Sequence, residues 1–299
     1  DCLLSRGLGD VYKRQSLMMR YNGKSILIDC GEGTQIAMRE KGWSPNPIDI
    51  ICFTHFHADH ISGLPGLLLT IGNAGRTEPL KLVGPQGLTY IVEGLRRIAP
   101  ELPFPLELIE LGKDTPNPLR LGEFEVSFCQ ADHMVRCYAY RIDVKRRGKF
   151  DPKKAEALGL PRPLWGKLQK EGAVEFEGKT YTPDMVLGAE RPGIAMAYCT
   201  DSRPVDRLAH FAKGVQLFIC EGMYGEEEKK PKALEHKHML FSEAARLAKF
   251  AEAEELWLTH FSPALQEPAE FLQNATDIFP NTLLGEERKM TTLYFPKEG

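Results

Sequence analysis

Residues 54–60, Thr54-His55-Phe56-His57-Ala58-Asp59-His60, place three imidazoles and one carboxylate within six positions, directly after an apolar run. Imidazole and carboxylate groups are natural ligands of zinc-like cations, and catalytic sites use few protein ligands so that a water molecule can bind as well. A lone histidine is more often an ordinary core or surface residue, but three histidines and an aspartate at this spacing are hard to explain structurally. The stretch therefore predicts a catalytic metal site.

The spacing within this stretch favours two metal positions. His55 and His57 lie two residues apart on an extended turn, so both side chains can point to one cation. Asp59 and His60 follow directly and can reach a second one. Hydrolases that bind two metals use them to position and activate water at a phosphate or carbonyl group.

Three further candidate ligands share one position in the pattern, because each lies just past an apolar strand-like run: His133, Asp201 and His260. In α/β sheets, functional groups collect beyond the carboxyl ends of the strands, which open onto a shared crevice. Asp201, flanked by Thr200 and Ser202, is the candidate bridging carboxylate, since one carboxylate can give an oxygen to each metal. The sequence thus predicts seven ligands at one place.

Strands and helices alternate along most of the chain. Apolar strand-like runs occupy residues 25–29, 48–54, 80–83, 124–130, 194–199, 217–220 and 256–259, and helical patterns occupy 35–41 and 242–253. This alternation predicts an α/β fold. We expect one catalytic domain over residues 16–299, and we interpret residues 1–15 as a doubtful N-terminal segment, such as an assembly scar, outside it.

The segment 145–191 breaks this alternation. Its prolines argue against any long regular element. Between Lys145 and Lys179 it carries ten basic and five acidic residues, although the whole chain has a net charge of -3. Two interpretations stay open: a solvated loop, or a basic arm that contacts a polyanion.

The composition is that of a folded globular protein, with 42% hydrophobic and 26% charged residues. We expect a cytoplasmic protein without a membrane segment, because no apolar run approaches about 18 residues and no signal-peptide pattern is present. The seven cysteines are scattered and never form a CxxC pair, which favours reduced thiols, most of them in the core.

The motifs resemble those of a known family. The His-x-His-x-Asp-His pattern at residues 55–60, with the later His, Asp and His, is similar to that of the metallo-β-lactamase fold. The narrower resemblance is to ribonuclease Z, the tRNA 3′-processing endonuclease. It rests on Glu-Gly-Thr-Gln at residues 32–35, Gly-Leu-Pro-Gly at 63–66 and Leu-Thr-His-Phe-Ser at 258–262, and it covers nearly all of residues 16–296.

The resemblance implies a role for each candidate residue. One zinc ion is expected at His55, His57 and His133, the other at Asp59, His60 and His260, with Asp201 as the bridge. Asp59 is also the expected proton acceptor. His238, paired with Glu221, is the expected proton donor to the leaving oxygen, and the alternative is a surface histidine beside Lys237. Mn²⁺ or Fe²⁺ in place of the two Zn²⁺ ions stays open, because these ligands accept all three.

The resemblance also implies the architecture and the partners. The expected fold is a four-layer αββα sandwich with two facing mixed sheets and a protruding exosite arm at residues 145–191. The expected substrate is precursor tRNA, cleaved to leave a 3′-hydroxyl on the tRNA and a 5′-phosphate on the trailer, and the expected assembly is a homodimer. Two alternatives stay open: another hydrolase of this fold acting on a small phosphodiester, sulfate ester or lactone, or a non-catalytic RNA-binding relative.

Overall fold

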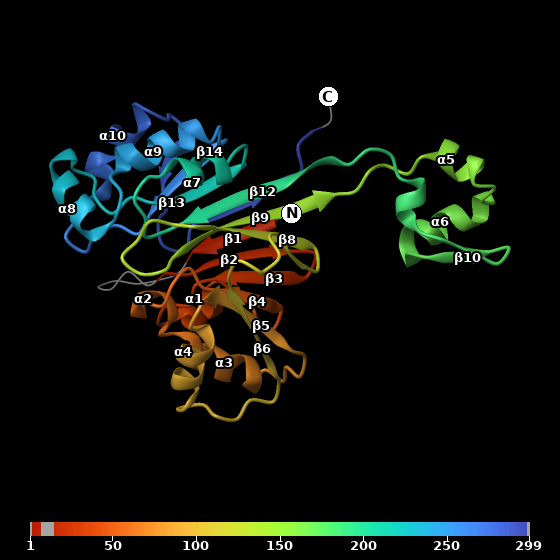
Figure 1. The fold of residues 1–299 in the computed structure, drawn as a ribbon, viewed down its shortest axis with the longest axis horizontal. Helices are drawn as coiled ribbons and strands as arrows, with labels where there is room; N and C mark the ends of the chain where they lie inside the picture. Colours follow the sequence, from red (N-terminus) through yellow and green to blue (C-terminus); the bar gives the residue numbers. More distant parts are fainter. Residues whose placement is uncertain (1, 7–14, 298–299) are drawn as a thin grey trace. The chain divides into compact units, whose positions relative to one another are not determined.

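The computed structural model describes residues 2–6 and 15–297 (Figure 1). The chain divides into two compact units. The main unit contains residues 1–143 and 195–294, and the small unit contains residues 144–194 and 295–299. The predicted seven ligands all belong to the main unit.

The N-terminal sheet of the main unit has seven strands in the order β16-β1-β2-β3-β4-β5-β6. Pairing is antiparallel from β16 to β3 and parallel from β3 to β6, so the sheet is mixed. The strands are β1 (Cys2–Arg6), β2 (Leu17–Tyr21), β3 (Lys24–Ile28), β4 (Ile48–Cys52), β5 (Leu80–Pro85), β6 (Leu106–Leu111) and β16 (Met290–Leu293).

The C-terminal sheet also has seven strands, in the order β15-β14-β13-β12-β9-β8-β7. It is mixed as well, because β12 to β15 pair in parallel and β7 pairs antiparallel with β8. The strands are β7 (Leu119–Leu121), β8 (Phe124–Gln130), β9 (Tyr138–Arg146), β12 (Arg191–Cys199), β13 (Leu217–Glu221), β14 (Glu255–Thr259) and β15 (Thr282–Leu284).

Helices cover the outer face of each sheet (Figure 1). With the N-terminal sheet lie α1 (Thr34–Glu40), α2 (Ala58–Ile61), α3 (Leu64–Asn73) and α4 (Leu88–Arg96). With the C-terminal sheet lie α7 (Asp206–Phe211), α8 (Lys230–His236), α9 (Phe241–Phe250) and α10 (Gln273–Thr276), together with the short 3-10 turns η2 (Glu227–Lys229) and η3 (Pro268–Phe271). Within the described residues, no helix is both long and apolar enough to cross a membrane.

Both faces of the central strands are buried, as in β3, β4 and β13. In β3, Leu27 packs into a cluster with residues of α3 and α4, whereas Ile26 and Ile28 are buried on the opposite face, because side chains alternate along a strand. Tyr140 of β9 donates a hydrogen bond to the Phe53 carbonyl after β4 at 2.7 Å and so joins the two sheets. The arrangement confirms the predicted fold with two facing mixed sheets between helical layers.

The small unit has a core of its own. It contains α5 (Pro152–Ala157), α6 (Arg162–Glu171), the hairpin of β10 (Val174–Phe176) and β11 (Lys179–Tyr181), and the 3-10 turn η1 (Pro183–Val186). Its core residues include Ala155, Leu168 and Val186. Trp165 packs against this core and donates a hydrogen bond from its indole nitrogen to the Leu160 carbonyl at 2.8 Å. Trp165 therefore helps to hold this unit together.

The structure differs from the sequence-based expectation at two places. We expected no long regular element in residues 145–191, yet α6 has ten residues. Pro163 lies in its first turn, where a proline costs no intrahelical hydrogen bond. We also kept residues 1–15 out of the fold, but residues 2–6 form β1 between β2 and β16. The rest of that segment, residues 1 and 7–14, lies outside the described residues.

Candidate metal centre

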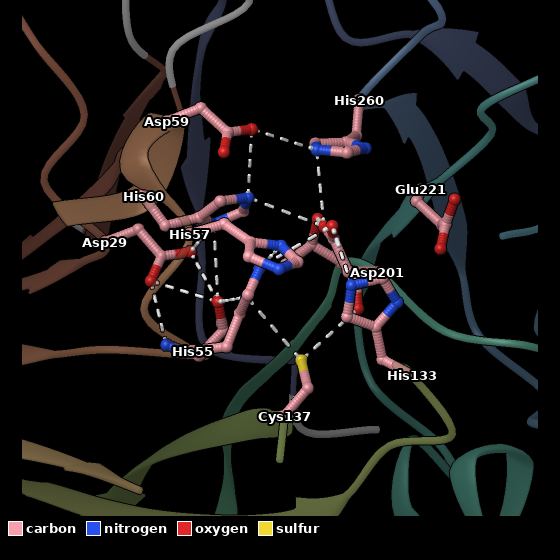
Figure 2. A network of polar contacts seen from close by, with 12 residues as sticks. Asp29, His55, His57, Asp59, His60, His133, Cys137, Asp201, Glu221 and His260 are labelled. Carbon is pink, nitrogen blue, oxygen red and sulfur yellow. Dashed lines mark hydrogen bonds and ion pairs between the residues drawn. The ribbon is translucent and has the colours of Figure 1, made fainter. Parts of the chain in front are cut away.

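The seven predicted ligands meet at the carboxyl ends of the strands (Figure 2). His55 follows β4, His133 follows β8, Asp201 follows β12 and His260 follows β14. The remaining ligands lie on the turn after His55 and at the start of α2. Because strands of both sheets end here, residues far apart in the sequence lie side by side.

The first group can hold one cation. The ligand atoms of His55, His57, His133 and Asp201 all lie within 4.8 Å of one another. His55 Nε2 lies 2.9 Å from His57 Nδ1, and His55 Nε2 and His133 Nε2 each lie 3.7 Å from Asp201 Oδ2. Three imidazole nitrogens and one carboxylate oxygen thus surround one point, which is a ligand set typical of zinc.

The second group lies beside the first. Asp59, His60 and His260 also have ligand atoms within 4.8 Å of one another. Asp59 Oδ2 lies 3.3 Å from His60 Nε2 and 3.5 Å from His260 Nε2. The side chain of Asp59 is 41% exposed, so its carboxylate is accessible to solvent while it faces both imidazoles.

Asp201 joins the two groups through its two oxygens. Oδ2 faces His55 and His133, whereas Oδ1 lies 3.5 Å from His60 Nε2 and 3.3 Å from His260 Nε2. Asp201 and His260 both have a left-handed backbone, with φ of 41° and 56°. Non-glycine residues in this conformation are uncommon and cluster at functional sites. The two turns aim both side chains into the space between the sheets' ends.

Polar side chains contact the ring nitrogens of the ligands that face away from the site, and so orient them. Asp29, directly after β3, lies with Oδ2 2.8 Å from His60 Nδ1 and accepts hydrogen bonds from the amide and hydroxyl of Thr54. Bonding of Nδ1 leaves His60 Nε2 directed at the site. Cys137 Sγ lies 3.8 Å from His55 Nδ1. The sequence pattern indicated no such role for Asp29 or Cys137, although Asp29 directly follows β3.

Three of the candidate ligands, His55, Asp59 and Asp201, have pKa shifts that favour the ligand form. Burial and the neighbouring histidines lower the pKa of His55 to about 2, so this imidazole is neutral, as a ligand must be. Burial favours the uncharged form of Asp201, but His260, His60 and His55 outweigh it and hold its pKa below the usual range. The pKa of Asp59 is lowered in the same way by His260 and His60. Both carboxylates are therefore ionised.

Two imidazole nitrogens test whether the residues fit a metal. His60 Nε2 and His133 Nε2 are buried and make no hydrogen bond of good geometry, although carboxylate oxygens lie 3.3–3.7 Å away. A buried polar atom without a partner is costly, and native proteins seldom contain one without a reason. Both atoms face the space between the ligands, one in each group. The cluster therefore fits divalent cations.

His238 and Glu221 also lie at the centre. Glu221 ends β13 and is fully buried, and its Oε2 lies 3.1 Å from His238 Nδ1. His238 follows α8 and its ring lies 5.6 Å from that of His260, centroid to centroid. The structure thus brings together the pair that the resemblance implied, and the alternative of a surface histidine fails because the side chain of His238 is only 12% exposed.

The fold and the site define a class, the metal-dependent hydrolases of the metallo-β-lactamase superfamily. A family model described as the metallo-β-lactamase superfamily matches residues 9–144. Two solved structures have the same fold. The metallo-β-lactamase fold protein YhfI from Bacillus subtilis has 19% identity and a TM-score of 0.67, covering 97% of this chain and 99% of its own. The short form of human tRNase Z has 20% identity and a TM-score of 0.66, with coverage of 99% and 100%.

Sequence relatives narrow this class to one family. A ribonuclease Z from Lachnospira eligens is 56% identical over 284 residues, which are 95% of this chain and 93% of the relative. A ribonuclease Z from Clostridium acetobutylicum is 53% identical, with coverage of 94% and 92%. The chain belongs to the ribonuclease Z family and is a hydrolytic endoribonuclease. The resemblance found in the sequence is confirmed, and the histidine–aspartate cluster supports a divalent metal.

Proposed function

We propose that this chain removes the 3′ trailer from precursor tRNA and that its cluster binds two Zn²⁺ ions. Cleavage leaves a 3′-hydroxyl on the tRNA and a 5′-phosphate on the trailer. The observation that carries the proposal is Asp201, whose two oxygens face two separate groups of ligands. Family membership supports RNA as the substrate, and the ligand set supports zinc, with Mn²⁺ or Fe²⁺ as competitors.

The metal ligands divide into two sets in this proposal. His55, His57 and His133 would hold one ion, Asp59, His60 and His260 would hold the other, and Asp201 would give an oxygen to each. Bound there, the two ions supply Lewis-acid stabilisation of the anionic phosphate and lower the pKa of a water molecule. Asp59 accepts the proton of the attacking water. Its carboxylate suits this task because it is ionised and 41% exposed.

His238 protonates the 3′-oxygen that leaves. Burial lowers the pKa of its imidazole, but the adjacent Glu221 carboxylate more than offsets this effect, so the pKa lies above its usual value. A histidine with a raised pKa is protonated near neutral pH and can donate a proton. Glu221 accepts from Nδ1 and thereby leaves Nε2 free to face the substrate.

The small unit binds the body of the tRNA. Its basic residues are largely exposed and include Lys153, Lys167 and Lys179. Folded RNA is recognised mainly through shape and phosphate contacts, which lysine and arginine supply. A rival hydrolase that acts on a small phosphodiester has no use for this basic surface.

Replacing Lys153, Lys167 and Lys179 together by alanine is expected to weaken binding of precursor tRNA and to flatten its salt dependence. The slope of log K against log salt should fall by roughly one for each phosphate that the protein no longer neutralises. The matched control replaces three exposed lysines of the main unit, Lys113, Lys213 and Lys249. Filter binding at several salt concentrations measures both sets. If the small-unit and main-unit triple variants lose the same affinity for precursor tRNA, the small unit has no special role in binding it.

We further propose that the chain acts as a homodimer in which the small unit of one subunit holds the tRNA that its partner cleaves. The family resemblance supports this assembly. A mixture of the Asp59→Ala variant with the triple small-unit variant is expected to cleave more precursor tRNA than either variant alone, since one subunit then supplies each function. Sedimentation velocity gives the mass. A monomer, or a mixture no better than its parts, would refute the proposal.

A further inference from the structure

The segment Lys237–Leu240 carries His238 from α8 to α9. Lys237 has a left-handed backbone with φ of 56°, which ends α8 and turns the chain toward the metal ligands. The His238 amide donates to the Ala233 carbonyl at 2.9 Å, and the Met239 amide donates to Glu221 Oε2 at 3.2 Å. These two hydrogen bonds hold part of the segment. The other polar groups of its backbone need partners elsewhere, because the segment is largely buried.

Arg203 supplies one of these partners. Its Nη1 donates to the His238 carbonyl and also to Glu243 Oε2 at 2.8 Å, while its Nη2 donates to Glu243 Oε1 at 2.6 Å. The side chains of Arg203 and Glu243 are only 11% and 6% exposed. The Arg203 guanidinium therefore binds the Glu243 carboxylate through two nitrogens and donates to the His238 carbonyl at the same time.

Glu243 holds the far end of the same segment. It lies in the first turn of α9, and its Oε2 accepts a hydrogen bond from the Leu240 amide at 3.0 Å. Arg203 thus bonds the carbonyl of His238 directly and is linked to the amide of Leu240 through the Glu243 carboxylate. Arg203 itself lies two residues after Asp201, and its amide donates to the Asp132 carbonyl beside His133 at 2.9 Å. The same residue thus joins the loops of two metal ligands to the segment of His238.

We infer that Arg203, through its buried ion pair with Glu243, is a positioning residue that sets His238 against the leaving oxygen. The inference rests on the proposed function, in which His238 is the proton donor. This role also explains why residue 203 is an arginine. A guanidinium presents several donors in a rigid plane and can bind a carboxylate and a carbonyl together, whereas a lysine ammonium is a point charge on a flexible stem.

The variant Arg203→Met is expected to slow the single-turnover cleavage of precursor tRNA by about 100-fold, the loss that a misplacement of roughly 1 Å produces. Affinity for the RNA and zinc content should stay at the wild-type level, because the Arg203 side chain bonds no metal ligand and Arg203 lies outside the small unit. The cleavage rate of Arg203→Lys should lie between those of the wild type and Arg203→Met. A precursor with sulfur in place of the leaving 3′-oxygen should be cleaved by Arg203→Met at nearly the wild-type rate, since a thiolate leaves without a proton.

A lower stability of the Arg203→Met variant must be distinguished from a misplaced His238. Arg203→Met leaves the Glu243 charge buried, which destabilises a protein, and the double variant Arg203→Met/Glu243→Gln removes that charge. We expect the double variant to regain thermal stability and to stay slow on the oxygen substrate. Arg76→Ala is the control, because Arg76 is also buried and donates to backbone carbonyls such as those of Ile48 and Pro79. It should lower Tm and leave the cleavage rate unchanged below Tm.

Two results would overturn the inference. One is a double variant that regains both stability and the full rate, and the other is an equal loss for Arg203→Met on the oxygen and sulfur substrates. If the wild-type chain does not cleave precursor tRNA, the proposed function fails instead. The wild-type control therefore distinguishes the two failures.

Discussion

Asp59→Ala is expected to lower the rate of precursor-tRNA cleavage by about 10⁴-fold or more, at or beyond the upper end of what one acid–base group supplies. The variant loses the proton acceptor and one carboxylate of the second group of ligands together. RNA binding should be kept, because the proposed contacts to tRNA lie in the small unit. Single-turnover cleavage and filter binding on the same preparation measure the two effects.

The matched control for this prediction is Asp114→Ala, which removes an exposed carboxylate outside the cluster. It should behave as the wild type in both assays. Asp59 is itself partly exposed, so its replacement creates no cavity and should leave the fold intact. If Asp59→Ala loses binding as severely as cleavage, the division of roles between the cluster and the small unit is wrong.

His238→Ala is expected to lower the cleavage rate by roughly 10²- to 10⁴-fold, the range of a general acid, with little change in RNA affinity. The loss should largely disappear with a leaving 3′-sulfur, for which proton donation is unnecessary. His236→Ala is the control, since His236 lies two residues away and its side chain is 57% exposed. A His238→Ala variant that is equally slow with oxygen and sulfur would remove His238 from proton donation.

The sequence could predict that the candidate ligands lie together because of how this fold places them. His133, Asp201 and His260 each come shortly after a strand, β8, β12 and β14, and the carboxyl ends of strands meet by geometry. The strand at 124–130 has the same bounds in the structure, and the helix predicted at 242–253 begins one residue earlier and ends at Phe250. These elements have strong apolar patterns, which local sequence records directly.

The sequence could not predict the residues that support the site or the small unit only through contacts with other residues. Arg203 and Glu243 lie 40 residues apart and meet only because α9 packs beside the turn after β12. An arginine and a glutamate at such a separation look like ordinary surface charges. Trp165 is a similar case, because its indole contact with Leu160 depends on the fold of the small unit. Pairings between distant residues leave no periodic trace in a single sequence.

The most direct test of the proposed function is the cleavage of a precursor tRNA with a 3′ trailer, with the cut mapped at nucleotide resolution and the metal content measured. We predict a single cut at the 3′ end of the tRNA body, a 3′-hydroxyl on the tRNA and a 5′-phosphate on the trailer. A chelator should abolish cleavage and added Zn²⁺ should restore it, with two zinc ions per subunit in the active protein. Intact precursor, or cleavage that is unchanged after complete removal of metal, would contradict the proposed function.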